Sequence, residues 1–445
     1  MSKIVRNNDA AVIRAAAHEI TSIAAYDPLV QMAGEAQCVL IGEASHGTHE
    51  FYETRAHLTK RLIQEKGFRA VALEADWPDT FRVHRFVTGR GDDKNANDAL
   101  SDFRRFPAWM WRNTVMLEFI EWLRAWNAER SIENGFAGVY GLDLYSMHTS
   151  IEAVLGYLDK VDPPSARRAR HRYGCFDHFG EDPQHYGLAT VAGGAEPCEN
   201  EVIDQLIELR RKYAELIGRN GHVGEEEFFS AEQNARLIMN AERYYRSMFH
   251  GRASSWNLRD EHMFETLNEL FAHLDGGRAK VVVWAHNSHL GDARATAMSG
   301  RGELNVGQLV RERLDRHSFA IGFTTYSGTV TAASDWGEPA ERKRVRPALA
   351  GSYEALFHAA GFSRFWIDLR ERSEAIDVLR DDRLERAIGV IYRPETERLS
   401  HYFEARLPDQ FDAVIHLDET YALEPLERTS GWDRGELPET YPSAL

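Results

Sequence analysis

The chain has 445 residues, of which 43% are hydrophobic and 27% are charged, an ordinary composition for a soluble globular protein. This composition excludes a mainly disordered chain, a collagen-like fibre and a small disulfide-stapled protein. The 53 basic and 69 acidic residues give a formal net charge of −16, which argues against a broad surface for nucleic acid or anionic membranes. We therefore expect no nucleic-acid partner.

The cysteine count and the hydropathy pattern indicate where the protein resides. Cys38, Cys175 and Cys198 form a sparse, odd-numbered set without a CxxC motif, which suits a reducing compartment. No apolar run approaches the roughly 18 residues that span a bilayer, and the polar stretch 1–9 has no apolar signal-peptide core. We predict a cytoplasmic protein without membrane contact.

The first recognisable unit in chain order is a strand, a turn and a helix. The apolar run 38–41 predicts a strand buried on both faces, and the glycine-flanked segment 42–47 ends it. Thr48 is a suitable N-cap for the helix that follows, and Gly67 is a suitable C′ residue. A second strand at 70–73 completes a βαβ unit, which implies parallel strands.

The same alternation continues along the chain. Asn113 can cap an amphipathic helix, and further strands are predicted at 138–142, 280–285, 319–324, 365–368, 388–392 and 413–417. Between 146 and 276 helical periodicity replaces the strand signals, apart from an irregular loop at 174–198.

These elements predict an α/β fold with a mostly parallel central sheet flanked by helices, and a large helical insertion that forms a cleft or lid. The predicted boundaries place the first part of the α/β core at 1–146, the helical insertion at 147–276, the second part of the core at 277–423 and a loosely packed C-terminal tail at 424–445.

Ionisable residues follow four of the predicted strands, at the points where the strands end. In chain order they are Glu43, His46, Glu74, Asp143, His286 and His289. The carboxyl ends of parallel strands lie at one edge of a sheet, where open α/β sheets bind their ligands. The convergence of several such groups predicts a catalytic cleft.

Two of the candidates carry their own structural expectation. Arg55 lies on the apolar stripe of its predicted helix, and because an isolated buried charge is costly, we expect it to pair with Glu43 or Glu74. A snorkelling or purely structural arginine fits the periodicity equally well. His46 near a carboxylate suits a general base, whereas the alternative is a turn histidine bonded to a backbone carbonyl.

Other chemistries compete for the same residues. His286 and His289 could bind a metal together with a carboxylate, or donate hydrogen bonds to an oxyanion, but without an HExxH motif we favour neither a metal nor a cofactor. Ser45 stands in a GxxSxG run rather than the GxSxG elbow of serine hydrolases, which makes it a second-choice nucleophile. A group of aromatic residues is more typical of core than of a ligand platform, yet it could wall an apolar pocket: Phe103, Phe106, Trp109 and Trp111.

Several short motifs together resemble those of the erythromycin esterase family. They are Ile41-Gly42-Glu43-Ala44-Ser45-His46-Gly47-Thr48, Glu53-Thr54-Arg55, Leu73-Glu74-Ala75-Asp76, Trp111-Arg112-Asn113, Gly141-Leu142-Asp143 and Trp284-Ala285-His286-Asn287-Ser288-His289, and they keep their order over residues 36 to 420. The resemblance implies a central α/β layer with a helical insertion around a deep cleft. It also implies hydrolysis of a macrolide lactone by water, without a covalent intermediate or an obligatory metal.

The resemblance assigns roles residue by residue. His46 would be the general base on water, Glu43 would position that base or the water, and Arg55, Glu74 and His286 would complete the polar cluster. Our mechanistic hypothesis adds that Arg55 and His286 stabilise the oxyanion while Glu43 and Glu74 hold them in place. His289 would be supporting, as would Asp143 and Ser45 at the same sheet edge.

The substrate is the least defined part of this hypothesis. The segment 284–296, with Asn305-Val306-Gly307-Gln308, looks more like family members that carry a succinoglycan-biosynthesis label than like the resistance enzymes. The leading hypothesis is therefore an erythromycin esterase-like hydrolase of a small-molecule ester or lactone, with macrolide inactivation as one expected activity. The alternatives are a metal-dependent hydrolase and a non-catalytic binding protein for a large polyketide or saccharide, and the sequence predicts no oligomeric state.

Overall fold

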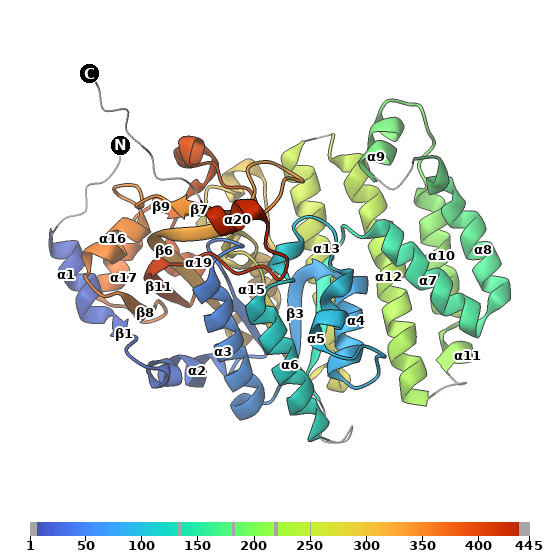
Figure 1. Ribbon diagram of the computed structural model, residues 1–445, viewed down its shortest axis with the longest axis horizontal. Coiled ribbons are helices and arrows are strands. Elements are labelled where there is room, and N and C mark those ends of the chain that lie inside the picture. The colour runs from blue at the N-terminus through green and yellow to red at the C-terminus, as the bar shows by residue number, and fades with distance from the viewer. Residues whose placement is uncertain (1–6, 131–135, 180–182, 218–220, 250, 436–445) are drawn as a thin grey trace.

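The core of the protein is a nine-stranded mixed sheet (Figure 1). The computed structural model describes residues 7–130, 136–179, 183–217, 221–249 and 251–435. The strand order is β1-β8-β11-β6-β2-β5-β3-β4, and β7 pairs with the C-terminal part of β6. The strands are β1 (His18–Glu19), β2 (Cys38–Ile41), β3 (Phe68–Asp76), β4 (Gly138–Asp143), β5 (Lys280–Trp284), β6 (Ser318–Ala332), β7 (Glu341–Val345), β8 (Arg364–Asp368) and β11 (Ala413–Thr420). A separate antiparallel pair is formed by β9 (Arg383–Arg386) and β10 (Tyr402–Ala405).

Parallel pairing dominates the sheet. The run β11-β6-β2-β5-β3-β4 is parallel throughout, whereas β1, β7 and β8 pair antiparallel. In the central strand, Ile41 lies opposite Trp284 on one side and Ile321 on the other. The predicted mostly parallel α/β sheet is therefore confirmed.

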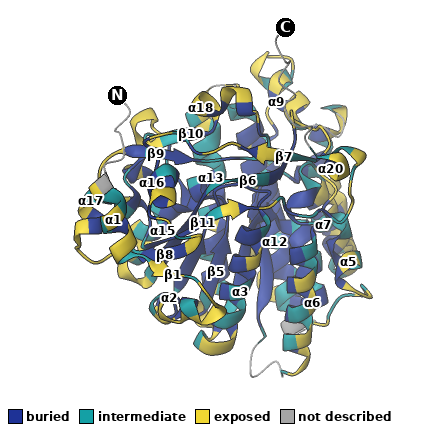
Figure 2. Cartoon of the chain, turned by 60° about the vertical axis from the view of Figure 1, so that its left-hand side comes forward, coloured by how far each residue is buried: buried dark blue, intermediate teal, exposed yellow. Residues whose placement is uncertain are grey.

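Both faces of the sheet are covered by helices, as the unbroken apolar strands require. Alternate residues of β2 enter different cores: Cys38 and Leu40 face one cluster, and Val39 and Ile41 face the other. The second cluster is covered by α2 (Asp27–Ala33), α3 (His49–Lys66) and α6 (Thr114–Ala128). The first is covered by α1 (Asn7–Ala16), α13 (Arg252–His273), α15 (Val306–Leu314), α16 (Tyr353–Ala359) and α17 (Glu374–Leu379). Figure 2 shows the buried strands between helices whose outer faces are exposed.

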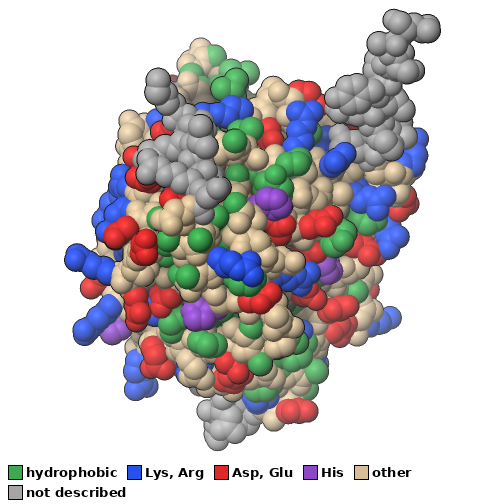
Figure 3. All heavy atoms as spheres, turned by 90° about the vertical axis from the view of Figure 1, so that its left-hand side faces the viewer, with side chains coloured by type: hydrophobic (Ala, Val, Ile, Leu, Met, Phe, Trp, Pro, Cys, Tyr) green, Lys and Arg blue, Asp and Glu red, His purple; other side chains and the backbone are tan. Residues whose placement is uncertain are grey.

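Other helices outside the segment between β4 and β5 connect or flank these layers. They are α4 (Trp77–Val87), α5 (Ala96–Ala99), α14 (Asn287–Leu290), α18 (Glu397–Ser400), α19 (Leu407–Gln410) and α20 (Ser430–Arg434). On the face shown in Figure 3, acidic and basic side chains are interspersed, and no large basic patch is visible there.

The predicted helix ends are confirmed in two of three cases. Gly67 follows α3 in the left-handed region at φ 72°, where glycine is least strained. The Asn113 side chain accepts a hydrogen bond from the backbone N–H of Met116 at 2.8 Å and so caps α6. Thr48 stands at the N-cap position of α3, but its hydroxyl bonds Ser45 instead of the helix, so its predicted capping bond is wrong.

The chain between β4 and β5 is helical, and its described residues contain no strand. Its helices before α13 are α7 (Met147–Val161), α8 (Pro163–Tyr173), α9 (Pro183–Val191), α10 (Glu199–Arg211), α11 (Tyr213–Ile217) and α12 (Gly221–Ser247). They gather on the right of Figure 1, beyond β3 and α4. None of the described helices is long and apolar enough to cross a membrane.

Two predictions fail in segment 174–198: the irregular loop, and the reading of the cysteines as a set suited to a reducing compartment. The segment 174–198 contains a 3-10 helix, η4 (Gly174–Phe179), as well as α9, and Cys175 forms a disulfide with Cys198 across a Cα separation of 6.1 Å. The cysteine count concealed this pair because 23 residues separate its members and only the folded insertion brings them together. The disulfide also removes the cysteine argument for a reducing compartment.

Two further corrections concern the C-terminal third of the chain. Residues 388–392 make only isolated bridges, Ser45 with Ile388 and Ala333 with Ile391, instead of a strand. The tail predicted to be loose is packed over 424–435, where the buried Trp432 indole donates a hydrogen bond to Thr331 at 2.8 Å. Residues 436–445 lie outside the described residues.

Candidate active site

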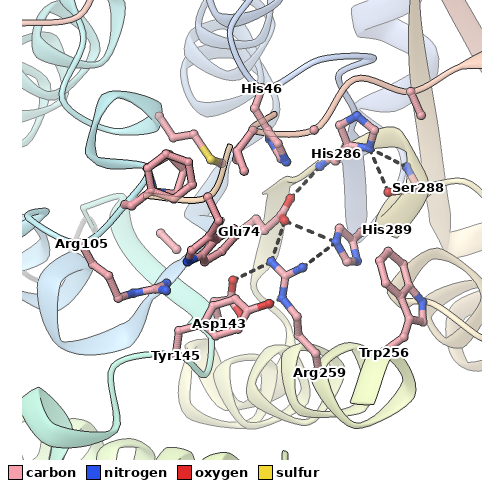
Figure 4. Close-up of a pocket in the computed structure, with 18 of the residues that line it drawn as sticks. His46, Glu74, Arg105, Asp143, Tyr145, Trp256, Arg259, His286, Ser288 and His289 are labelled. Atoms are coloured by element: carbon pink, nitrogen blue, oxygen red, sulfur yellow. Dashed lines mark hydrogen bonds and ion pairs between the residues drawn. The ribbon is translucent and has the colours of Figure 1, made fainter. Parts of the chain in front are cut away.

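A cavity of about 550 Å³ lies at the carboxyl ends of β2, β3, β4 and β5 (Figure 4). Five of the eight residues singled out in the sequence line it: His46, Glu74, Asp143, His286 and His289. Much of the remaining wall comes from segment 103–111, from α13 and from segment 387–403, and single residues such as Asp79 of α4 and Trp336 complete it. The topology therefore brings together residues that are up to 243 positions apart in the chain, as the strand-end argument requires.

The turn after β2 presents His46 to the cavity. At Gly47 a Cβ atom would lie 1.8 Å from the carbonyl oxygen of Thr331, so only glycine lets this turn approach β6 so closely. The His46 ring is buried, and its Nδ1 atom lies 2.8 Å from Glu43 Oε1.

Glu43 joins His46 to Arg55. Its second oxygen, Oε2, lies 2.6 Å from Nη2 of Arg55, a side chain with no exposed surface. Arg55 thus pairs with one of the two carboxylates expected for it. Because Arg55 does not line the cavity, it lies behind Glu43 and is not placed to touch an oxyanion, contrary to the role expected for it in the mechanistic hypothesis.

The contact with Glu43 determines which nitrogen of a neutral His46 ring carries the proton. A carboxylate accepts hydrogen bonds, so Nδ1 of a neutral His46 carries the ring proton and donates it to Glu43. The Nε2 atom then keeps its lone pair for a group in the cavity. This is the tautomer that a general base needs.

His286 follows β5 and caps α14. Its backbone N–H donates to Glu74 Oε2 at 2.8 Å, and its Nδ1 atom accepts a hydrogen bond from the backbone N–H of Ser288 at 3.2 Å. Burial, with a contribution from nearby His46, lowers the pKa of His286 to about 3, although Glu74 and the carbonyl of Ala44 oppose the shift. The ring is therefore neutral.

A neutral His286 whose Nδ1 atom accepts must carry its proton on Nε2. That atom is buried and makes no well-formed hydrogen bond with the described residues, although the carbonyl of Ala44 lies near enough to the ring to interact with it. The His286 and His46 rings lie 4.9 Å apart between centroids. A lone pair on one ring and an N–H without a well-formed hydrogen bond on the other thus lie side by side.

Glu74 is presented by an irregularity in β3. The register between β3 and β4 shifts between Leu73 and Asp76, so that β3 carries one extra residue there. Such bulges redirect side chains and are common beside active sites. Glu74 Oε1 lies 2.7 Å from Nη2 of Arg259.

Arg259 is the centre of a buried charge cluster that the sequence did not reveal. Besides Glu74, it binds Asp143 through Nε at 3.0 Å and Nη2 at 2.7 Å. Burial opposes ionisation of Glu74, but His289 and Arg259 outweigh it and hold the pKa of Glu74 well below its ordinary value. For Asp143, Arg259 likewise overcomes burial and lowers the pKa.

His289 completes this Arg259 cluster. Its Nδ1 atom lies 2.9 Å from Asp260 Oδ1, and its Nε2 atom lies 3.3 Å from Glu74 Oε1. Burial and Arg259, whose Nη1 is 3.0 Å from Nε2, oppose a charge on the ring, but Asp260 and Glu74 prevail and raise the pKa of His289 to about 9. Asp260 and Glu74 therefore favour the protonated form of His289, and its ring stacks on Trp256 at a centroid distance of 4.5 Å.

The missed residues share one helix and one signal. Trp256, Arg259, Asp260 and Met263 have the i, i+3, i+4, i+7 spacing of a buried helix face. Two charged residues on that stripe give the same signal that Arg55 gave. No described residue of α7–α12 lines the cavity, so the insertion contributes to it through α13 alone, with Arg252, Trp256 and Arg259.

Ser45 and the aromatic group occupy other positions. Ser45 is buried, bonds the hydroxyl of Thr48 and does not line the cavity. Phe103, Phe106 and Trp111 line the cavity, whereas Trp109 is buried in the core.

The residues present do not fit a metal site. No group of three or more His, Cys, Asp or Glu among the described residues is arranged to hold a metal ion. Of the carboxylates in the cavity wall, Glu74 and Asp143 are bound to Arg259, whose positive charge would repel a divalent cation.

Comparison with known proteins identifies the family. The model of the family described as Erythromycin esterase matches residues 63–420. Two relatives are the Bacillus subtilis (strain 168) protein YbfO, 23% identical over 85% of this chain and 83% of its own, and erythromycin esterase type II from Escherichia coli, 20% identical over 90% and 93%.

Solved structures share the fold over nearly the whole chain. A Bacillus cereus protein superposes with a TM-score of 0.77 at 21% identity, covering 95% of this chain and 99% of its own. A mutant erythromycin esterase, EreC, in its open conformation gives a TM-score of 0.67 at 17% identity, covering 92% and 96%. On the extent of the family match, the chain belongs to the erythromycin esterase family.

Proposed function

We propose that the protein hydrolyses a small-molecule ester or lactone with a water molecule activated by His46. The observation that carries this proposal is the juxtaposition of His46 and His286, a ring with a free lone pair beside a ring whose N–H makes no well-formed hydrogen bond with the described residues. Family membership supports hydrolase chemistry independently.

The reaction follows from these two groups. Nε2 of His46 takes a proton from water while the oxygen of that water attacks the carbonyl carbon. The Nε2–H of His286 donates to the oxyanion of the tetrahedral intermediate. When the intermediate collapses, the bond to the alkoxy oxygen breaks and protonated His46 returns its proton to that oxygen, which yields an acid and an alcohol, or one hydroxy acid from a lactone.

Glu43 and Arg55 act through His46. Glu43 keeps the ring proton on Nδ1, and Arg55 keeps Glu43 in place. Glu74 holds His286 in position, because it accepts a hydrogen bond from the backbone N–H of that residue. General-base catalysis contributes about 10²–10⁴-fold and one oxyanion donor about 10²–10³-fold.

The competing chemistries are less well supported. A Ser45 nucleophile needs a hydroxyl that faces the cavity, and Ser45 does not line it. A metal-dependent hydrolase and a non-catalytic binding protein remain as outcomes of the test below. A cytoplasmic location stays a prediction from the sequence.

The test is mass spectrometry of a panel of macrolides and simple esters after incubation with the protein. We expect one panel member to gain one water, with the rate reduced at least 100-fold by His46→Ala. A macrolide that gains water assigns macrolide inactivation. A turnover unchanged in His46→Ala would refute the base assignment, and activity lost in chelator would favour the metal-dependent alternative. Tight binding without any product would favour the binding protein.

A further inference from the structure

The cavity contains an acidic side chain that the proposed hydrolysis does not use. Asp79 is the third residue of α4 and lines the cavity with only 8% of its surface exposed. It makes no hydrogen bond or ion pair with any residue in the described part of the chain. Burying a carboxyl group without a partner is costly, so such a group calls for an explanation.

The neighbouring cations are already bound to other carboxylates. Arg105 binds Asp76 at 3.2 Å, and Arg82 binds Asp93 and Asp102 at 2.6 Å each. At the same cavity, Arg252 and Arg301 both bind the buried Glu303.

The exposed Arg104 donates to the carbonyl of Ser101, and Arg259 is held by Glu74 and Asp143. Asp79 is thus the one cavity-lining carboxyl, among the described residues, without a bound cation.

The charges around Asp79 favour the binding of a positively charged ligand. Burial, with the nearby charges of Asp76 and Asp102, raises the pKa of Asp79 to about 8, and Arg105 and Arg104 do not overcome this shift. An empty cavity therefore holds Asp79 protonated near neutral pH. A cation that enters would allow it to ionise and form a charge-assisted contact.

Aromatic side chains line the same cavity. Phe103 directly follows the 3-10 helix η2 (Leu100–Asp102), which packs against α4. The ring of Phe106 meets that of Trp336 edge to face at 5.0 Å, and Trp336 is 55% exposed at the cavity. Aromatic rings together with a carboxylate are the groups that recognise alkylammonium ions.

We propose that Asp79, with Phe103, Phe106 and Trp336, forms a subsite for an alkylammonium group, so that the preferred substrate is an ester carrying a positive charge. The ester carbonyl would lie at His46 and His286 while the ammonium group lies against Asp79. This inference rests on the proposed hydrolase function for the reaction, but the binding of the cation can be measured without it.

The test compares two esters that differ only in charge. One is a p-nitrophenyl ester whose acyl chain ends in a trimethylammonium group, and the other ends in a tert-butyl group of the same shape. For the wild-type protein we expect kcat/KM to be about tenfold higher for the cationic ester, the size of one charge-assisted contact. Asp79→Asn should reduce that preference to less than about twofold, mainly through KM.

Matched variants separate this role from a structural one. Asp98→Asn changes a half-buried acid on α5 that does not line the cavity, and it should keep the preference. Trp336→Leu, at a half-exposed position, should lower the preference only partly. Asp79→Asn should melt no earlier than the wild-type protein, because it removes a buried unpaired acid.

The outcomes distinguish the subsite from the hydrolase proposal. A wild-type protein without charge preference, or an Asp79→Asn variant that keeps it, overturns the subsite. If neither ester is cleaved, the proposed function fails for these esters, and calorimetric titration with tetramethylammonium decides the subsite. Binding to the wild-type protein that weakens about tenfold in Asp79→Asn supports it, and absence of binding overturns it.

Discussion

Glu43→Gln tests whether Glu43 fixes the tautomer of His46. In the wild-type protein one carboxylate oxygen accepts from His46 Nδ1 at 2.8 Å and the other binds Arg55 at 2.6 Å. Arginine can only donate, so the glutamine must turn its oxygen toward Arg55 and its NH₂ group toward His46. Nδ1 then has to accept, and the ring proton moves to Nε2, where it blocks proton uptake from water.

The expected loss is that of the whole general base. We expect kcat/KM for a p-nitrophenyl ester to fall about 10²–10⁴-fold, or about 3–5 kcal/mol in activation free energy. Because Arg55 loses its charged partner in a fully buried position, stability should also fall, by about 3–5 kcal/mol. Kinetics must therefore be measured where thermal unfolding shows the variant to be folded.

Two further variants separate the tautomer effect from damage to the fold. Glu50→Gln changes a buried glutamate in α3, whose Oε2 accepts a hydrogen bond from the backbone N–H of Tyr421 at 2.8 Å. Its activity should stay within about twofold of wild type, as for substitutions away from the site. In Glu43→Gln with Arg55→Met, the amide is free to turn its oxygen back to His46, and activity should recover at least about tenfold. A folded Glu43→Gln variant with near-normal turnover, or a double variant no better than the single one, would refute the tautomer argument.

Three other predictions follow from the same site. His286→Ala should lower kcat about 10²–10³-fold with little change in KM, because it removes an oxyanion donor, and an unchanged kcat would exclude that role. Burial lowers the pKa of His289, but the carboxylates of Asp260 and Glu74 outweigh it and raise the pKa to about 9, above the unfolded value near 6.5. The stabilisation from this charged pair is therefore complete below pH 6.5 and is lost as the pH rises to 9. Urea unfolding should therefore show the wild-type protein losing about 3 kcal/mol more over this interval than His289→Gln with Asp260→Asn, and equal losses would contradict the charged pair. Incubation with a chelator should leave the rate within about twofold, because Arg259 is paired with Glu74 and Asp143, and inactivation restored by added metal would contradict this.

The sequence predicted the parts of the fold that depend on local pattern. The strands of the parallel core are apolar runs, so the local sequence alone predicts β2, β3 and β5. By contrast, β1 has two residues and β7 is the polar run Glu341–Val345, and neither has an apolar alternation. Both depend on pairing with a strand distant in the chain, which a local pattern does not encode.

The site divides in the same way. His46, Glu74 and His286 were predicted because they directly follow recognisable strands, and parallel topology alone brings strand ends together. Arg259 comes from the middle of a helix, and its contact with Glu74 spans 185 residues. Only the docking of α13 against the end of β4 makes that contact, although the charge on the apolar stripe of α13 was a readable signal.

Two histidines three residues apart have pKa values shifted in opposite directions because of what α13 supplies. The His286 ring faces His46 and a backbone cap, and burial lowers its pKa, whereas the His289 ring faces Asp260, which with Glu74 raises its pKa against the effect of burial. Glu74 touches both, through the backbone of one and the ring of the other.

Without Arg259, Glu74 and Asp143 would be buried acids near one another without their main counter-charge, and each would tend to bind a proton. Glu74 could then no longer serve as the charged acceptor for the backbone N–H of His286. The helical insertion therefore contributes to the proposed catalytic site through α13, and a protein trimmed to its α/β layers would lack the charges that keep the His286 donor in position.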